Sequence, residues 1–241
     1  MITKEEYYAR YPIRDPAHAA SRIAGEQIQE NAQKYFSGRM LEIGCGDKSK
    51  GALVGEYVDE HVGLDLPDSE TPHTEIAADV VGSALDMPLD DESFDCVLST
   101  AVLEHLEEPQ RALSESYRVL KPGGYALYTM PLFWHLHEEP RDFFRYTKYG
   151  LRHLFTTAGY ELVHLKALSG FFVTFGAELG YYLRRFARGP ATSRIVAGIT
   201  AVLNKVAPRL DRIEALRDEK FTWMYLVVAR KPGQENGGEE E

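Results

Sequence analysis

The stretch Leu41-Glu42-Ile43-Gly44-Cys45-Gly46 decides the fold of this chain. The apolar run that leads into it predicts a buried strand, and the two glycines predict a tight turn that opens into a helix. Glycine has no Cβ, so the backbone can take positive φ there and a flat ligand can lie against the main chain. In an open α/β sheet, such a turn lies at the carboxyl end of a strand, where ligands bind.

A second apolar run, residues 61–66, contains the acid that such a pocket needs. Its Asp65 lies about 20 residues after the glycines, where a carboxylate can accept hydrogen bonds from ribose hydroxyls. The turn and Asp65 together predict a nucleoside-binding pocket. The dinucleotide fingerprint of dehydrogenases needs a third glycine three residues after Gly46, but Ser49 stands there, so that alternative fails. The P-loop pattern does not occur either.

The rest of the chain alternates between strand and helix patterns. Strands are predicted over residues 76–81, 93–100, 125–130, 160–168 and 221–229, and helices over residues 17–36, 48–57, 109–120 and 147–158, with a stop at residues 121–124. This alternation favours right-handed crossovers and a mostly parallel sheet. Residues 1–16 are predicted to form an irregular aromatic arm. The arm is interpreted as a strap on the surface, with a flap over the ligand as the alternative.

Composition and charge limit the classes of protein to which this chain can belong. With 241 residues and 44% hydrophobic content, the chain can bury the core of one large α/β domain. The 27 basic and 37 acidic residues give a formal charge of −10, which disfavours a nucleic-acid partner because such binding rests on Lys and Arg meeting phosphates. Two cysteines suggest no disulfide framework, and the sequence shows neither a transmembrane run nor a signal pattern. A cytoplasmic location is therefore expected.

Five strings of this sequence occur in the order and at the spacing of a known family. They are LEIGCG (41–46), VGLD (62–65), MPLDDESFDCVLS (87–99), VLEHL (102–106) and RVLKPGGYALYTMP (118–131). The chain resembles the class I S-adenosylmethionine-dependent methyltransferases, in the small-molecule group related to the ubiquinone and menaquinone methyltransferases. The resemblance implies an α/β, Rossmann-like, doubly wound sheet of seven strands, mostly parallel, whose last strand runs antiparallel beside the sixth.

A domain plan follows from these patterns. Residues 1–37 are expected to form an N-terminal arm and helix, residues 38–231 the methyltransferase domain, and residues 232–241 a disordered acidic tail. A helical insertion is expected at about 170–219, between strands six and seven, where a short turn would suffice. Its two predicted helices are apolar on one side and locally basic. Packing against the domain, a homodimer through the 170–210 helices and a peripheral membrane contact stay open as its role.

The cofactor that the resemblance implies is S-adenosylmethionine. The glycine loop would face its methionine part, Asp65 its ribose and Leu66 its adenine. An acidic residue often reaches the adenine amino group in this family, but Ser83 stands at that position here, with Asp79 and Asp86 on either side. The predicted cofactor-binding residues are Glu42, Gly44, Cys45, Gly46, Asp65, Leu66, Ser83, Ala84, Leu85, Thr100 and Ala101.

Residues 131–147 are dense in groups that can bind and activate a methyl acceptor. Methyl transfer to a hydroxyl needs an aligned nucleophile and removal of its proton, and His135 or His137 is predicted to act as the general base. Arg145 is predicted to bind an anionic acceptor, with Asp142 holding Arg145 as scaffold as the alternative. The predicted catalytic residues are His135, His137 and His105, and the predicted acceptor-binding residues are Trp134, Asp142, Arg145 and Tyr146.

Glu104 and His105 of the VLEHL string are interpreted mainly as a cap and anchor for the following helix. In small-RNA 2′-O-methyltransferases a Glu-x-x-Glu-His pattern and a later histidine bind a divalent metal. Ala101 stands where the first glutamate would be, so one ligand of that pattern is missing; no metal is predicted, and metal dependence stays open as the less favoured alternative. The expected function is methylation of a small-molecule acceptor, most simply O-methylation of a sugar, quinone or lipid-linked precursor. A non-catalytic S-adenosylmethionine-binding regulatory protein is the alternative.

Overall fold

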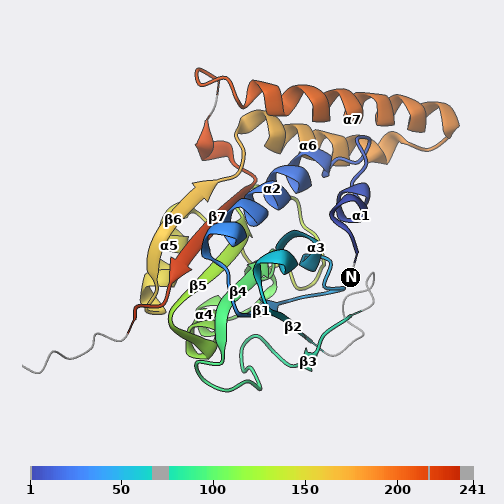
Figure 1. Ribbon diagram of the computed structural model, residues 1–241. Helices are drawn as coiled ribbons and strands as arrows, with labels where there is room; N and C mark the ends of the chain where they lie inside the picture. Colours follow the sequence, from blue (N-terminus) through green and yellow to red (C-terminus); the bar gives the residue numbers. More distant parts are fainter. Residues whose placement is uncertain (1, 67–75, 217, 234–241) are drawn as a thin grey trace, which may run out of the picture.

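A computed structural model describes residues 2–66, 76–216 and 218–233, and a seven-stranded sheet forms its centre (Figure 1). The strand order is β3-β2-β1-β4-β5-β7-β6. β7 is antiparallel to both of its neighbours, and the other paired strands are parallel. The predicted doubly wound sheet, with its last strand antiparallel beside the sixth, is confirmed. The strands are β1 (Arg39–Ile43), β2 (Glu60–Asp65), β3 (Val80–Val81), β4 (Phe94–Thr100), β5 (Leu120–Pro131), β6 (Glu161–Ala167) and β7 (Met224–Arg230).

Helices cover both faces of the sheet (Figure 1). Leu113 of α4 and Leu151 and Phe155 of α5 pack on one face, whereas α2, α3 and the insertion pack on the other. The helices are α1 (Lys4–Ala9), α2 (His18–Tyr35), α3 (Gly51–Val54), α4 (Pro109–Val119), α5 (Lys148–Thr157), α6 (Phe171–Leu183) and α7 (Pro190–Leu210), and the short 3-10 helices are η1 (Gly55–Tyr57), η2 (Leu103–His105), η3 (Arg184–Phe186) and η4 (Glu219–Phe221).

The central strands explain these two layers. In β4, Val97 packs into the core on the α4 side, while Cys96 and Leu98 pack into the core on the α2 side. Successive side chains of a strand point to opposite faces, so a continuous apolar run suits a sheet that is covered on both sides. Because β2, β1 and β4 are adjacent and parallel, their carboxyl ends lie at the same edge of the sheet. That edge carries Asp65, Gly44 and Thr100.

The N-terminal arm is partly helical, so the prediction of an irregular arm is wrong for residues 4–9. Thr3 Oγ1 accepts a hydrogen bond from the backbone N–H of Glu6, and the Glu6 carboxylate accepts one from the backbone N–H of Thr3. This reciprocal capping satisfies the first N–H groups of α1. Tyr7 of the helix is buried, and Arg10 lies 2.6 Å from Asp47, just after the glycine turn. The arm is therefore fastened to the domain beside that turn.

Two strands differ in extent from the prediction. β3 covers only the end of the predicted strand 76–81, and β5 begins before the predicted stop at residues 121–124. The register of β4 against β5 shifts there, and Gly123 takes a φ of +84°, which favours glycine. Residues 121–124, whose sequence resembles a helix stop, therefore form the irregular start of β5. The tail predicted over 232–241 lies, apart from its first residues, outside the described residues.

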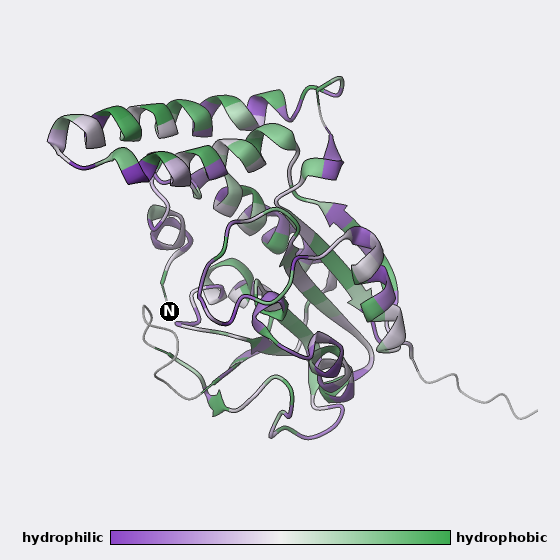
Figure 2. Cartoon of the chain, turned by 180° about the vertical axis from the view of Figure 1, so that it is seen from behind, coloured by the Kyte–Doolittle hydropathy of each residue, from purple (hydrophilic) through white to green (hydrophobic). Residues whose placement is uncertain are grey.

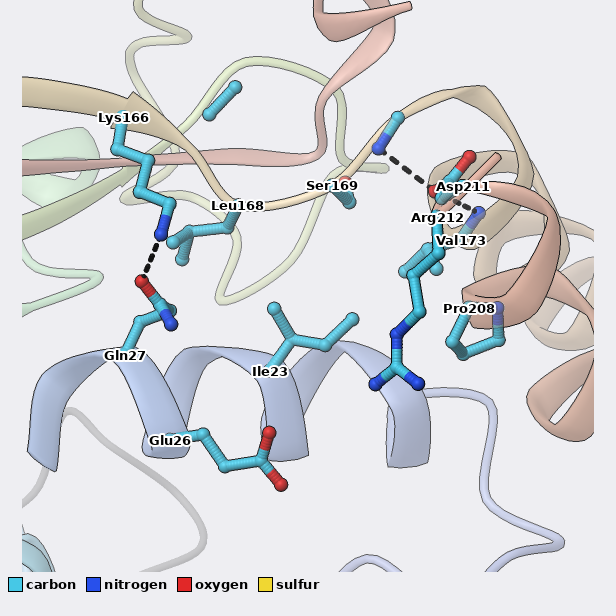
Figure 3. Close-up of a pocket in the computed structure, with 12 residues that line it drawn as sticks. Ile23, Glu26, Gln27, Lys166, Leu168, Ser169, Val173, Pro208, Asp211 and Arg212 are labelled. Atoms are coloured by element: carbon cyan, nitrogen blue, oxygen red, sulfur yellow. Dashed lines mark hydrogen bonds between the residues drawn. The ribbon is translucent and has the colours of Figure 1, made fainter. Parts of the chain in front are cut away.

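The insertion between β6 and β7 is a helix pair. α6 and α7 lie side by side and cross the end of α2 (Figure 1). Asp211, just after α7, accepts hydrogen bonds from the backbone N–H groups of Gly170, Phe172 and Val173 at the start of α6. Figure 3 shows Asp211 across a small cavity from Ile23 of α2. In the described part of the chain, no helix is long and apolar enough to cross a membrane.

Candidate active site

The turn after β1 takes the backbone shape that its glycines predict. Gly44 and Gly46 have φ values of +68° and +50°, which residues with a Cβ rarely adopt. A Cβ at Gly44 would lie 2.4 Å from Cγ2 of Val102, whereas a Cβ at Gly46 would meet no atom within 4 Å. The Asp65 carboxylate accepts hydrogen bonds from the backbone N–H groups of Gly46, over 2.7 Å, and Leu66, over 2.8 Å. Open space beside Gly46 thus has a carboxylate at its edge.

A cavity of about 400 Å³ opens at these strand ends, and we call it the strand-end cavity. Its wall combines the turn after β1, the end of β2, the segment that follows β3 and the end of β4. The structure therefore brings together most of the predicted cofactor-binding residues. Those that line the cavity are Gly44, Gly46, Asp65, Leu66, Ser83, Ala84, Thr100 and Ala101.

Three of the predicted cofactor-binding residues do not line this cavity. Glu42 is buried, with Oε2 2.8 Å from Nε2 of His61, and its Oε1 has no hydrogen-bond partner among the described residues. Cys45 packs against Gly63 of β2, and burial raises the pKa of its thiol to about 12. Leu85 packs against the core on the α4 side. All three residues pack behind the residues that line the strand-end cavity.

Asp79, one of the acids considered for the adenine contact, also lies outside the lining of the strand-end cavity. Its carboxylate accepts hydrogen bonds from the backbone N–H of Gly63, over 2.7 Å, and from Nζ of Lys48, over 2.5 Å. Its hydrogen bonds to Gly63 and Lys48, which outweigh the effect of partial burial, lower the pKa of Asp79. This carboxylate is engaged in holding β2 against the turn.

A second cavity, of about 260 Å³, adjoins the first, and we call it the aromatic cavity. Its aromatic lining comes from the arm, the loop after β5, the insertion and the start of β7: Tyr7, Tyr11, Trp134, Tyr181 and Trp223. Six residues line both cavities: Tyr11, Lys50, Thr100, Ala101, His105 and Glu138. The two cavities therefore meet at the end of β4. Ala101 and Glu138, at this junction, have φ values of +55° and +51°, a strained backbone typical of functional sites.

Glu104, His105 and His137 gather at this junction. One possible ligand atom from each residue lies within 4.8 Å of the others. The side chain of Glu104 is fully buried, and burial raises the pKa of its carboxyl to about 8. Burial, followed by the electrostatic effect of neighbouring His105, lowers the pKa of His137. The N-cap of α4 is Glu108, so the interpretation of Glu104 and His105 as a helix cap is wrong.

The loop after β5 is braced by an ion pair. The guanidinium of Arg145 donates to both Asp142 oxygens, over 2.6 and 2.8 Å, and to the backbone oxygens of Trp134 and His135. Arg145 holds the pKa of Asp142 well below its usual range. Tyr146 is buried and donates its hydroxyl to the carbonyl of Leu103.

Some of the predicted catalytic and acceptor-binding residues line a cavity, whereas others are held in the interactions of this loop. Trp134 and His137 line the aromatic cavity, and His105 lines both cavities. Asp142, Arg145 and Tyr146 line neither, and the structure brings Asp142 and Arg145 together as the scaffold alternative described. The imidazole of His135 also lies outside both linings, with Nδ1 3.1 Å from Glu178 of α6. Among the histidines of this loop, only His137 reaches a cavity wall.

Sequence reasoning missed several lining residues. Tyr7 and Tyr11 come from the arm, and the spacing Thr3-x-x-Glu6 is a capping signal that could have placed Tyr7 on a helix. Lys50 reaches the cavities from the position just before α3, and Tyr181 reaches the aromatic cavity from α6, on a distant part of the chain. No local pattern marks them, because only the packing of separate elements brings them to the site.

Known proteins match the same part of the chain. A family model described as a methyltransferase domain matches residues 41–128. The chain is 32% identical over 111 residues to a probable S-adenosylmethionine-dependent methyltransferase of Mycolicibacterium smegmatis, covering 44% of this chain and 43% of that protein. It is 32% identical over 113 residues to the ubiquinone biosynthesis O-methyltransferase of Ruegeria pomeroyi, covering 43% of this chain and 46% of that protein. The chain thus spans less than half the length of these relatives.

A solved structure shares the fold. The (4+2)-cyclase SpnF aligns with a TM-score of 0.53 and 20% identity, over 86% of this chain and 80% of that chain. That likeness shows the fold alone, and the same fold can carry different reactions. The family model, in contrast, spans the glycine turn, Asp65 and the end of β4, which together build the strand-end cavity. Residues 41–128 of this chain therefore match a methyltransferase domain, and the chain is similar to S-adenosylmethionine-dependent methyltransferases.

Proposed function

We propose that this protein transfers the methyl group of S-adenosylmethionine to a hydroxyl of a small-molecule acceptor. The observation that carries the proposal is the junction of the two cavities, where Thr100, Ala101 and His105 line both. A donor in the strand-end cavity and an acceptor in the aromatic cavity would meet at the end of β4. Holding two reactants in line removes much of the entropic barrier to a bimolecular displacement.

The strand-end cavity suits a nucleoside that carries an amino-acid tail. The open space beside Gly46 exposes main chain, and the Asp65 oxygens keep lone pairs that can accept from ribose hydroxyls. Leu66 and Ala84 offer apolar surface to adenine, and Lys50 is placed to attract the carboxylate of the tail. S-adenosylmethionine supplies, when bound, a methyl carbon activated by its sulfonium sulfur.

The aromatic cavity suits an acceptor with a ring or an aliphatic chain. Trp134, Tyr181 and Trp223 provide flat apolar walls, and the polar groups Glu104, His105 and His137 lie at the end nearest the junction. A hydroxyl at that end must lose its proton as the new C–O bond forms and the C–S bond breaks. We assign removal of that proton to this polar cluster.

The insertion supports a lipid-linked acceptor. Phe175, Leu179 and Tyr182 of α6 and Ile199 and Val202 of α7 are each at least 37% exposed, and Figure 2 shows hydrophobic residues along both helices. Exposed basic residues accompany this apolar face: Arg184, Arg185, Arg188, Arg194, Lys205 and Arg209. Basic amphipathic helices bind anionic lipid surfaces, and an overall charge of −10 makes this local excess of positive charge distinctive. We therefore assign this face to the surface of an anionic bilayer.

Two other features favour oxygen as the methylated atom and a quinone or lipid as the carrier. The relative from Ruegeria pomeroyi is described as a ubiquinone biosynthesis O-methyltransferase. Tyr181 of the insertion also lines the aromatic cavity, so the helix pair that would rest on the bilayer contributes to the acceptor site. An amphiphilic acceptor could then enter from the lipid side.

The proposal is tested by transfer of a labelled methyl group. Purified full-length chain is incubated with methyl-labelled S-adenosylmethionine and a panel of catechols, hydroquinones, polyprenyl phenols and sugars. We expect label in a hydroxylated, lipid-soluble acceptor. Binding of S-adenosylmethionine without transfer to any acceptor on the panel would favour the alternative, a non-catalytic binding protein.

A further inference from the structure

The carboxylate of Glu104 is buried without a partner. The side chain has no exposed surface, and neither carboxylate oxygen has a hydrogen-bond partner in the part of the chain that the structure describes. A buried polar group without a hydrogen bond is destabilising, and a buried carboxylate without a cation is more so. The fold therefore maintains an unfavourable group at the junction of the two cavities, which points to a ligand that satisfies it.

His105 presents a nitrogen lone pair toward the same place. Its Nδ1 lies 2.7 Å from the carbonyl oxygen of Arg141, and a carbonyl can only accept, so Nδ1 carries the proton. Nε2 is then unprotonated in the neutral ring. Nε2 lies 3.8 Å from a carboxylate oxygen of Glu138. The backbone thus fixes the tautomer and leaves Nε2 as a ligand atom.

His137 is oriented in the same way by a carboxylate. Its Nδ1 lies 3.3 Å from Oδ2 of Asp142 and 3.5 Å from Nη2 of Arg145. That Nη2 already donates to Asp142 and to the carbonyl of His135, which uses both of its hydrogens. A proton on Nδ1 of His137 would face the Asp142 carboxylate, and in that tautomer Nε2 keeps its lone pair. Carboxylates and carbonyls that hold the second nitrogen in this way are typical partners of metal-binding histidines.

We propose that Glu104, His105 and His137 form a binding site for one divalent transition-metal cation. One possible ligand atom from each of the three residues lies within 4.8 Å of the others, and ligands of a tetrahedral zinc ion with bonds of about 2.1 Å lie about 3.4 Å apart. Small side-chain rotations close that difference. One carboxylate and two imidazoles suit Zn²⁺, Co²⁺ or Mn²⁺ better than Mg²⁺ or Ca²⁺, which prefer oxygen ligands.

The site leaves coordination positions open toward the acceptor. Three protein ligands leave room for a fourth, and the cluster lies on the wall of the aromatic cavity. The half-exposed Glu138 stands beside His105 as a further carboxylate. A hydroxyl oxygen bound to the cation has a lowered pKa and releases its proton to water more readily. This second step rests on the proposed function, whereas the binding of the cation does not.

The binding test uses the full chain, freed of metal with a chelator and then desalted. Titration calorimetry and equilibrium dialysis with Zn²⁺, and visible absorption spectra with Co²⁺, should show one bound ion per chain. Glu104→Gln and His137→Ala should each weaken binding by about 100-fold or more, since loss of an outer-shell partner alone weakens it roughly 10–100-fold. His153→Ala removes an exposed histidine of α5 and should leave binding unchanged.

The melting temperature, Tm, reports separately whether the variants fold. Glu104→Gln keeps the size of a buried side chain whose carboxylate oxygens have no hydrogen-bond partner among the described residues, so its metal-free Tm should equal or exceed that of the wild type. Zn²⁺ should raise the Tm of the wild type but not that of Glu104→Gln. Absence of binding at millimolar Zn²⁺ and Co²⁺, or binding that both variants keep, would overturn the proposal.

A parallel titration with S-adenosylhomocysteine separates the two proposals. If the nucleoside binds and the cation does not, the metal site is wrong and methyl transfer stands. If the cation binds and the nucleoside does not, the metal site stands and the proposed function falls.

Discussion

The carboxylate of Asp65 accepts a hydrogen bond from the backbone N–H of Gly46 over 2.7 Å, and so ties the end of β2 to the turn after β1. Both residues line the strand-end cavity, so the hydrogen bond fixes the shape of two of its walls at once. A carboxylate held in this way keeps lone pairs for further donors. The proposed ribose-binding position is thus already formed in the ligand-free protein.

The two glycines of the turn should respond differently to alanine. Gly44→Ala places a Cβ 2.4 Å from Val102, so we expect the free energy of unfolding to fall by about 2–5 kcal/mol. Gly46→Ala meets no atom within 4 Å, and only its positive φ should lower stability, by about 1 kcal/mol. Its methyl would instead enter the space beside the cavity and weaken S-adenosylhomocysteine binding at least about tenfold. Urea denaturation and calorimetry measure both effects, and equal stability losses in the two variants would contradict the described turn.

The segment that carries Ser83 and Ala84 is anchored to α4 by Glu115 and Arg118. Arg118 donates to Glu115 and to the backbone oxygens of Met87 and Leu89, and Glu115 accepts from the backbone N–H of Met87. We expect Glu115→Gln to lower the free energy of unfolding by about 1–2 kcal/mol at neutral pH. Glu107→Gln, which changes an exposed glutamate two residues before α4, is the matched control.

The same pair predicts a pH dependence. The side chain of Arg118 lowers the pKa of Glu115 below its ordinary value of 4.5. The stabilisation is therefore present above about pH 4.5 and is lost as the pH falls through the native pKa. Wild-type protein should lose stability in that acid range, and Glu115→Gln should lose less. Parallel stability curves for the two proteins would rule out a role for this carboxylate.

The apolar face of α6 and α7 should bind anionic vesicles. We expect the protein to float with phosphatidylglycerol vesicles at low salt and to stay unbound with phosphatidylcholine vesicles, because the attraction is partly electrostatic. Arg185→Glu with Arg188→Glu should weaken binding at least about tenfold, since each basic residue near the surface contributes about 1 kcal/mol. Phe175→Ser with Val202→Ser should weaken it by removing apolar contact.

A matched control variant and a sedimentation measurement test the vesicle-binding prediction further. Tyr149→Ser changes a side chain that is 73% exposed on α5, away from the insertion, and should leave vesicle binding unchanged. Absence of flotation at low salt would refute the membrane assignment. Sedimentation that shows a dimer, dissociated by Phe175→Ser with Val202→Ser, would assign the face to a second copy of the chain.

Much of the sheet and of the strand-end cavity can be predicted from the sequence. The turn at Gly44 and Gly46 and the acid at Asp65 are local patterns, each set by backbone geometry over a few residues. The number of strands and the antiparallel last strand beside the sixth followed from the resemblance that these patterns supported. The arm was harder: its capping signal spans only Thr3 to Glu6, and its aromatic residues outweighed that signal in the prediction of an irregular segment.

The acceptor side could not be predicted in the same way. Arg145 and Asp142 satisfy each other instead of facing a cavity, and nothing in a list of polar residues shows which of them pair. Glu104 is buried, its backbone carbonyl accepts from the N–H groups of Phe143 and Phe144 in the loop after β5, and its carboxylate oxygens have no hydrogen-bond partner among the described residues. Such placement depends on tertiary packing, so it cannot be predicted from sequence patterns of a few residues. The cytoplasmic location, for the same lack of a local signal, stays a prediction.

Calorimetry with S-adenosylhomocysteine tests the central claim most directly. The wild-type chain should bind one equivalent. Asp65→Ala should weaken binding by about 1.5–3 kcal/mol, roughly 10- to 150-fold, because hydrogen bonds to a charged group are lost. Asp59→Ala, an exposed acid just before the opposite end of β2, should bind like the wild type. Absence of binding by the wild type, or equal affinity in Asp65→Ala, would contradict a nucleoside site at these strand ends.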